Sequence, residues 1–190
     1  MSRILWIAPK WPLPPHDGAR LVTANLLKAM SQAGHAIDLL AITEAGAAVD
    51  EAEACRNLGL RSATAIRRHD HPAAGWRRAL SLAARTLIAP CIPVTLQPYA
   101  APHIKASIER ALRGAECAAS PTHAPDPTPH EPPWDAVVYD GLHPAIHSSL
   151  IGEFFRPQTR AKIIYRAHNV ESIIWERKTE MVEGLSLIHI

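Results

Sequence analysis

Two short apolar runs, separated by a turn and an amphipathic segment, occupy the first forty residues and constrain the fold more than any other stretch. The runs span residues 3–8 and 35–42, and the first has the length of a strand that is buried on both faces. Between them, apolar residues from Leu21 to Met30 recur at the spacing of a helix with one buried face. Gly34 is placed to end this helix, because glycine adopts the left-handed conformation without strain. This order predicts a right-handed crossover in an α/β domain with a Rossmann-like parallel sheet flanked by helices.

The rest of the chain continues the alternation of helix and strand. Its patterns predict helices at 48–58, 76–89, 101–113, 142–155 and 170–182, an edge strand at 61–68, and strands at 134–139 and 161–167. Residues 114–133 contain six of the seventeen prolines, a density that predicts a loop because proline disrupts helices and interior strands. The stripe that contains Trp76 and Leu80 packs on the sheet or docks on an anionic membrane face, and the sequence leaves both interpretations open.

Composition excludes several classes of protein. The chain has 190 residues, 47% of them hydrophobic, which suits one domain with a sizeable core. Its net charge of +2 is too close to neutral to indicate nucleic-acid binding. No apolar stretch reaches the ~18 residues of a membrane-spanning helix, and residues 9–12 interrupt the first run too early for a signal peptide. We therefore expect a cytoplasmic protein, either free or peripheral at the inner face of the membrane.

The cysteines predict no structural site. Cys55, Cys91 and Cys117 are odd in number and widely spaced. This spacing indicates neither a disulfide framework nor a zinc site, and free thiols in a reducing compartment are the simpler interpretation.

Polar residues follow two of the later predicted strands. Asp140 and Gly141 form a turn, and they also lie where an α/β domain directs polar groups toward a ligand. His168, Asn169 and Glu171 crowd the end of the last predicted strand. The histidine is a candidate for hydrogen bonding or proton transfer to a ligand, or it caps the next helix or bonds to a nearby carbonyl. Asn169 is also a candidate N-cap of that helix.

Two stretches of the chain resemble one known family. The first reads RILWIAPKWPLPPHDGARLVTANLLKAMSQAGHAIDLLAI, and it combines an apolar strand, a proline-rich loop, a helix and the pair Gly34–His35. It resembles the opening of the family 4 glycosyltransferases, which have two Rossmann-like domains in the arrangement known as the GT-B fold. Ala19 stands where a second glycine is usual, and its methyl group limits backbone approach there. The second reads IIYRAHNVES and resembles the strand that ends in a histidine near the cleft of these enzymes.

The resemblance implies an enzyme that moves a sugar from a nucleoside-diphosphate sugar to a hydroxyl group of a polysaccharide or glycolipid. It implies retention at the anomeric carbon, without a metal or another cofactor. His168 would lie near the donor sugar, as the catalytic candidate. Gly18 opens the first helix, where backbone amides would stabilise the departing diphosphate. Asp140, Asn169 and Glu171 are candidates for contacts with acceptor hydroxyls.

The resemblance also predicts that this chain holds only one of the two domains. These enzymes grip the donor with a second domain that carries two glutamates eight positions apart, and no two glutamates here have that spacing. We expect residues 1–184 to form the acceptor-side domain, which would be inactive alone. Residues 185–190 read LSLIHI, a translation of the end sequence used in transposon-based sequencing libraries, so they form a non-native tail or a genuine apolar strand.

Two other functions are compatible with the same pattern. A sugar-binding or assembly module without turnover would use the same domain. A nicotinamide-binding domain of an oxidoreductase would carry G-x-G-x-x-G in its first loop, whereas PPHDGARLV contains a single glycine. Titration with nucleotide sugars and with NADH distinguishes these functions.

Overall fold

The computed structural model describes residues 1–68, 96–114, 134–147 and 161–167 of the chain. Its strands are β1 (Arg3–Ala8), β2 (Ala36–Thr43), β3 (Ser62–Arg67), β4 (Ala136–Asp140) and β5 (Lys162–Arg166). Its helices are α1 (Gly18–Gln32), α2 (Glu51–Leu58), α4 (Pro102–Leu112) and α5 (Leu142–Ala145), with a short 3₁₀ turn, η1, at Gln97–Tyr99.

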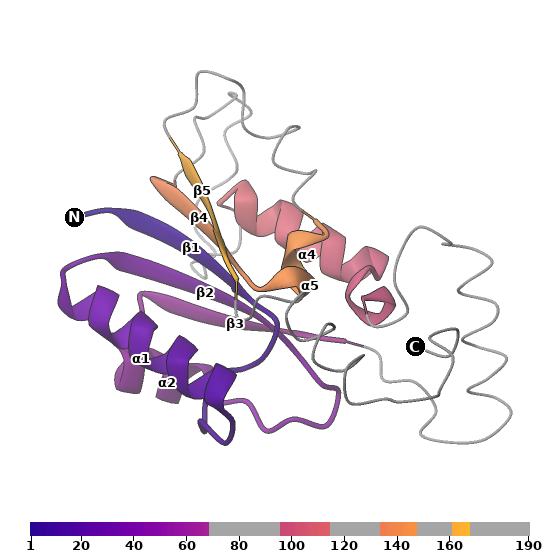
Figure 1. Ribbon diagram of the computed structural model, residues 1–190, viewed down its shortest axis with the longest axis horizontal. Coiled ribbons are helices and arrows are strands. Elements are labelled where there is room, and N and C mark those ends of the chain that lie inside the picture. Colours follow the sequence, from indigo (N-terminus) through magenta and orange to yellow (C-terminus); the bar gives the residue numbers. More distant parts are fainter. Residues whose placement is uncertain (69–95, 115–133, 148–160, 168–190) are drawn as a thin grey trace, which may run out of the picture.

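The five described strands are all parallel and lie in the order β3-β2-β1-β4-β5 (Figure 1). This arrangement confirms the predicted α/β domain with a Rossmann-like parallel sheet. Ile4 of β1 lies between Ile37 of β2 and Ala136 of β4. From β1 the chain adds β2 and β3 on one side, and β4 and β5 follow on the other, so the strand order reverses between β1 and β4. In α/β sheets, ligands bind outside the carboxyl ends of the strands at such a reversal.

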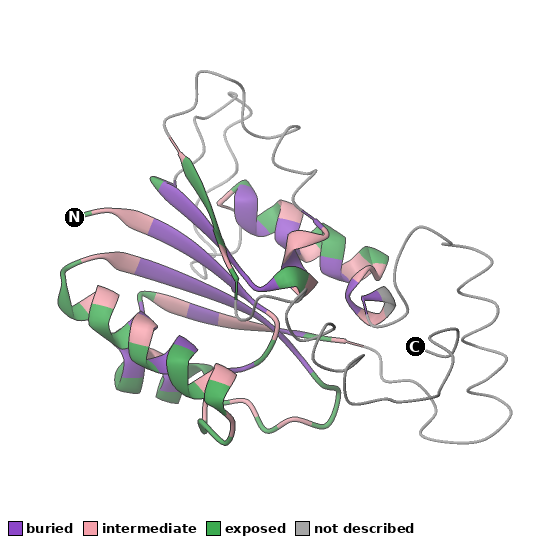
Figure 2. Cartoon of the chain, viewed as in Figure 1, coloured by how far each residue is buried: buried purple, intermediate pink, exposed green. Residues whose placement is uncertain are grey.

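Helices α1 and α2 cover one face of the sheet, and α4 and α5 cover the other (Figure 1). Alternate residues of β1 pack into the hydrophobic cores on the two faces of the sheet. Trp6 belongs to the same buried cluster as Leu27 on α1, and Ile7 belongs to the same cluster as Ile104 on α4. Figure 2 shows the central strands buried along most of their length, while the helices expose their outward faces. Because both faces are covered, β1 and β2 consist of nearly continuous apolar residues.

Aspartates begin the first two helices. The Asp17 side chain accepts a hydrogen bond from Arg20 N at 2.8 Å, and Asp50 accepts one from Glu53 N at 2.7 Å. These caps satisfy amides that have no partner within a helix. The cap at Asp50 explains why α2 begins after residue 48, where the sequence placed its start. Gly59 ends α2 with a φ of 68°, the left-handed conformation expected there.

The other predicted elements that fall within the described residues are confirmed, with small shifts at their ends. The helix predicted at 142–155 is shorter in its described part, because Ile146 and His147 form a turn. His147 N donates to the carbonyl of Pro144 at 3.1 Å, a bond between residues three apart that tightens the chain out of the α-helix. The predictions for 76–89, 115–133, 148–155, 170–182 and 185–190 lie outside the described residues. Among the helices of the described ranges, none has the length and apolar character needed to cross a bilayer.

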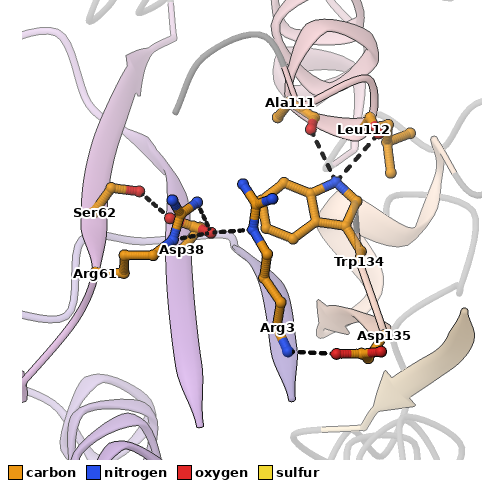
Figure 3. Close-up of polar contacts among 8 residues, drawn as sticks. All are labelled: Arg3, Asp38, Arg61, Ser62, Ala111, Leu112, Trp134 and Asp135. Atoms are coloured by element: carbon orange, nitrogen blue, oxygen red, sulfur yellow. Dashed lines mark hydrogen bonds and ion pairs between the residues drawn. The ribbon is translucent and has the colours of Figure 1, made fainter. Parts of the chain in front are cut away.

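A buried carboxylate joins the amino ends of three strands (Figure 3). Asp38 of β2 is 1% exposed and accepts hydrogen bonds from Arg61 and from the hydroxyl group of Ser62 at the start of β3. Arg3 Nε of β1 lies 3.6 Å from the same carboxylate. The Arg3 guanidinium also lies 4.4 Å from the centre of the Trp134 ring.

Trp134 connects this amino-end cluster to α4 (Figure 3). Its indole Nε1 donates to the carbonyls of Ala111 and Leu112 at 3.1 and 3.2 Å. These contacts satisfy carbonyls at the end of α4 that have no partner within the helix. Asp135 accepts a hydrogen bond from Arg3 N at 2.7 Å, so the start of β1 is attached to the segment before β4.

Candidate functional site

A cavity of about 350 Å³ lies at the carboxyl edge of the sheet, beside the reversal between β1 and β4. It is lined by the loop after β1, the first turns of α1, η1, the segment after β4, and β5 (Pro9, Lys10, Ala19, Arg20, Thr23, Tyr99, Gly141, Leu142, His143 and Tyr165). Small-molecule sites measure about 300–1,000 Å³, so this cavity is at the small end of that range. Its position agrees with the general rule for ligand sites in α/β sheets.

A buried polar network lies beneath the cavity. Asp140 is 0% exposed, and its Oδ2 accepts hydrogen bonds from Trp6 Nε1 at 3.1 Å and from the Thr23 hydroxyl at 2.8 Å. Its Oδ1 accepts from Arg166 Nε at 2.5 Å, and Arg166 Nη2 lies 2.5 Å from the same oxygen. Arg166 also donates to the Thr23 hydroxyl at 2.7 Å. Because Thr23 lines the cavity and Asp140 does not, the carboxylate supports the cavity from below.

The network occupies the accepting capacity of Asp140. An ionised carboxylate offers about four acceptor positions, and the contacts from Trp6, Thr23 and Arg166 use that capacity. The contact between Asp140 and an acceptor hydroxyl stays a prediction.

Two cations line the cavity, Lys10 from the loop after β1 and Arg20 from the first turn of α1. Lys10 Nζ lies 3.2 Å from Asp17 Oδ2, and Arg20 Nε lies 3.8 Å from the same oxygen. The hydrogen bond from Arg20 N, followed by the contact with Lys10, holds the pKa of Asp17 below its ordinary value against the opposing effect of burial. Asp17 is therefore a fixed negative charge between two positive ones at neutral pH.

Tyr99 and His143 form an aromatic part of the cavity wall. The rings of Tyr99 and His143 lie 4.5 Å apart between centroids, at an angle of 52°. Arg68 donates to the Tyr99 hydroxyl at 2.8 Å and to Glu44 at 2.9 Å. Burial raises the pKa of Tyr99, so its hydroxyl group keeps its proton at neutral pH. This wall offers flat, partly apolar surfaces beside the cationic side of the cavity.

A buried histidine holds the backbone of this wall. His147 is 6% exposed, and its Nε2 lies 2.8 Å from the carbonyl oxygen of Tyr99. The carbonyl only accepts, so Nε2 carries the proton in this contact. Burial lowers the pKa of His147 below 6.5, although the hydrogen bond to Tyr99 opposes this effect. Lys105 also lowers it and Glu109 raises it, both from α4.

The lowered pKa of His147 predicts a loss of stability in acid. The unfolded state binds more protons than the folded state at pH values near and below 6.5, so stability is full above that pH and falls as pH decreases. One such group contributes at most about 1.4 kcal/mol per pH unit. Urea denaturation at about pH 7.5 and about pH 5.5 should show a smaller pH effect for His147→Asn than for the wild type. The exposed His16, changed to Asn, is the control, and an unchanged pH effect in His147→Asn would contradict the assignment.

The predicted site residues differ in how they lie relative to the cavity. Gly18 is exposed at the first turn of α1, beside Ala19, and it is not among the lining residues. A Cβ at this position would meet no atom within 4 Å, so the space in front of it is open. Gly18 near a donor diphosphate stays a prediction. His168, Asn169 and Glu171 lie outside the described residues.

Sequence reasoning missed most of the residues that line the cavity. Lys10 and Arg20 stand at either end of the first loop, and their position at a ligand-binding edge was a usable signal. Thr23 lies one helical turn after Arg20, so the same argument reaches it. No sequence signal pointed to Tyr99, because it lies in a segment that is far in sequence from the strands whose ends form the cavity.

The fold and cavity define the class: a Rossmann-like α/β domain with a small-molecule cavity at the reversal of its strand order. No protein-family model matches the chain, and no curated protein matches it. Within the described ranges, no group of three His, Cys, Asp or Glu side chains is arranged to hold a metal ion.

Proposed function

We propose that this domain is the acceptor-side lobe of a retaining glycosyltransferase that uses a nucleoside-diphosphate sugar. The observation that carries the proposal is the cavity, which brings Lys10 and Arg20 together with Tyr99 and His143 at the carboxyl edge of the sheet. Aromatic rings offer flat apolar faces to a sugar ring, and cations complement phosphate groups. The acceptor would be a polysaccharide or glycolipid, and the lobe alone would not catalyse transfer.

The proposed chemistry needs negative charge to be stabilised as the nucleoside diphosphate departs. Amide groups at a helix N-terminus and nearby cations supply this stabilisation without a metal. In this proposal the first turn of α1, at Gly18, faces the diphosphate. His168 contacts the donor sugar, as the resemblance implies, and Asn169 and Glu171 contact the acceptor. Asp140 acts as a positioning residue through Thr23 and Arg166.

One observation favours a second candidate, a dinucleotide-binding domain of an oxidoreductase. Glu44 directly follows β2, where such domains place a carboxylate for the ribose of the cofactor. However, Glu44 is paired with Arg68 at 2.9 Å. The loop between β1 and α1 also spans residues 9–17, whereas dinucleotide-binding domains use a tight glycine turn. The glycosyltransferase proposal explains the longer loop and its cations better.

Calorimetric titration of the chain with UDP-sugars, GDP-sugars and NADH tests these proposals. We expect no tight binding of any of them by the lobe alone. Micromolar binding of NADH would overturn the proposal in favour of the oxidoreductase domain. Tight binding of a nucleotide sugar would contradict the role of an acceptor-side lobe.

A transfer assay tests the activity directly. The chain, supplied with the donor-binding domain that the proposal requires, should release UDP or GDP from a nucleotide sugar only when an acceptor is present. Sugar binding without any release would indicate the module without turnover.

A further inference from the structure

Arg20 differs from the other cations near the cavity, Lys10 and Arg68. Arg68 donates to Tyr99 and Glu44, and Lys10 contacts Asp17 at 3.2 Å. Arg20 Nε is buried and has no hydrogen-bond partner among the described residues; the carboxylate oxygen of Asp17 lies 3.8 Å away. That distance is too long for a hydrogen bond. A buried N–H group of a guanidinium without an acceptor is costly, so a ligand acceptor at this place would be favourable.

The local charge balance indicates the kind of acceptor that fits. Lys10 and Arg20 carry two positive charges at the cavity, and Asp17 supplies a single negative charge between them. Lys10 and Arg20 both line the cavity, whereas Asp17 is not among its lining residues. A phosphate monoester carries nearly two negative charges at neutral pH and three acceptor oxygens. It would complement both cations, whereas a carboxylate would duplicate what Asp17 already provides.

We propose that the cavity binds a soluble phosphorylated sugar, with the phosphate on Arg20 and Lys10 and the sugar ring against Tyr99 and His143. This inference rests on the proposed function for the ligand's meaning as an acceptor, and it changes one part of that function, because the acceptor becomes a soluble sugar phosphate monoester in place of a polysaccharide or glycolipid. The volume of about 350 Å³ suits a ligand of this size better than a dinucleotide. Arg20 can bind phosphate through two parallel N–H groups, and Lys10 can add a point charge.

Asp17 is an internal competitor in this site. Its carboxylate holds Lys10 and lies near Arg20, so a bound phosphate must share or replace these contacts. Asparagine is an N-cap as effective as aspartate, so Asp17→Asn preserves the start of α1 while it removes the competing charge. We therefore expect Asp17→Asn to bind phosphorylated sugars more tightly than the wild type, by about threefold to tenfold.

Titration calorimetry of the chain measures the binding. The probes are glucose 1-phosphate, glucose 6-phosphate, mannose 6-phosphate and fructose 6-phosphate, with inorganic phosphate and the three neutral sugars for comparison. We expect at least one sugar phosphate to bind saturably and more tightly than inorganic phosphate, and the neutral sugars to bind far more weakly. Binding of no sugar phosphate, or equal binding of the neutral sugars, would overturn the inference. Binding only to phosphatidylcholine vesicles that contain phosphatidic acid would also overturn it, since it would assign the phosphate to a lipid.

Charge variants locate the phosphate. Arg20→Gln should weaken binding of the sugar phosphate by at least about tenfold, because it removes a charge-assisted hydrogen bond. Lys28→Gln is the matched control, since Lys28 is an exposed cation on the same helix, two turns away, and it should leave the Kd unchanged. Arg20→Lys should restore part of the affinity. Equal effects of Arg20→Gln and Lys28→Gln would place the phosphate elsewhere and contradict the assignment.

The transfer assay separates this inference from the proposed function. Sugar-phosphate binding that Arg20→Gln weakens, together with a complete absence of sugar transfer, would leave the ligand class standing and overturn the glycosyltransferase. Transfer to a neutral acceptor, with a KM for that acceptor unchanged in Arg20→Gln, would leave the glycosyltransferase standing and overturn the phosphorylated acceptor.

Discussion

Replacement of Asp140 by alanine is expected to lower the free energy of unfolding by about 3–5 kcal/mol. The carboxylate is fully buried and accepts hydrogen bonds from Trp6, Thr23 and Arg166. Alanine would leave the Arg166 guanidinium, with a side chain that is 19% exposed, without its buried counter-charge. A buried charge without a partner costs far more than a lost surface ion pair, which contributes only about 0–1 kcal/mol.

Urea denaturation of the full chain, followed by circular dichroism, measures this loss. Asp135→Ala is the matched control, because Asp135 is an exposed carboxylate just before the same strand, β4. It accepts a hydrogen bond from Arg3 N at 2.7 Å, and its loss should cost about 1 kcal/mol. Equal losses in the two variants would show that burial of the Asp140 charge does not determine its contribution to the free energy of unfolding.

A double substitution separates charge from packing in the same network. Asp140→Leu with Arg166→Met removes both members of the ion pair and leaves apolar side chains. Replacement of a whole buried pair is often close to neutral, whereas removal of one member is not. The double variant should therefore be more stable than Asp140→Leu alone, with a coupling energy of about 1–3 kcal/mol in the cycle. Additive losses would show that the two side chains act independently.

The sheet was predictable from the sequence because it is parallel and covered on both faces. Such strands are nearly continuous apolar runs, and residues 3–8 and 35–42 show this plainly. Gly34 marked the end of α1, and its φ of 87° shows why glycine is suited to that position. Residues 61–68 have few apolar side chains and were predicted to form an edge strand, and β3 does lie at an edge of the sheet. Local signals were sufficient wherever hydrophobic period and turn chemistry agreed.

The polar partners inside the fold were not predictable. Trp6 and Asp140 lie 134 residues apart in sequence, and Thr23 and Asp140 lie 117 apart. Such contacts depend on the strand order and register, which a single sequence does not specify. The sequence identified Asp140 as a polar residue at a ligand-binding edge. It did not predict that Asp140 is buried in an ion pair with Arg166, because that contact depends on the pairing of β4 with β5. The predicted fold was sufficient to locate the site at the carboxyl edge of the sheet, but not to identify the residues that line it.

The second large loss of stability is expected from a substitution at the amino ends of the strands. Asp38→Ala is expected to lower the free energy of unfolding by about 2–3 kcal/mol. The carboxylate is 1% exposed and accepts from Arg61 and Ser62, so alanine leaves these donors without their acceptor. The expected loss is smaller than for Asp140, because the Arg61 and Arg3 side chains are 37% and 32% exposed and can turn toward water.

The place of Asp38 in the sheet predicts where the damage appears. β3 is an edge strand of the described sheet, and its amino end is attached to β2 through Asp38 and Ser62 (Figure 3). Amide hydrogen exchange should therefore increase most at the start of β3 in Asp38→Ala, because an edge strand opens more readily than a central one. Asp38→Asn is the control: it keeps an oxygen that accepts from Ser62, and it should lose about half as much stability. The sugar-phosphate affinity should stay at the wild-type value in both variants, since the cavity lies at the carboxyl ends of the strands and Asp38 at their amino ends. A uniform rise in amide exchange across all strands would show that Asp38 does not act locally on β3.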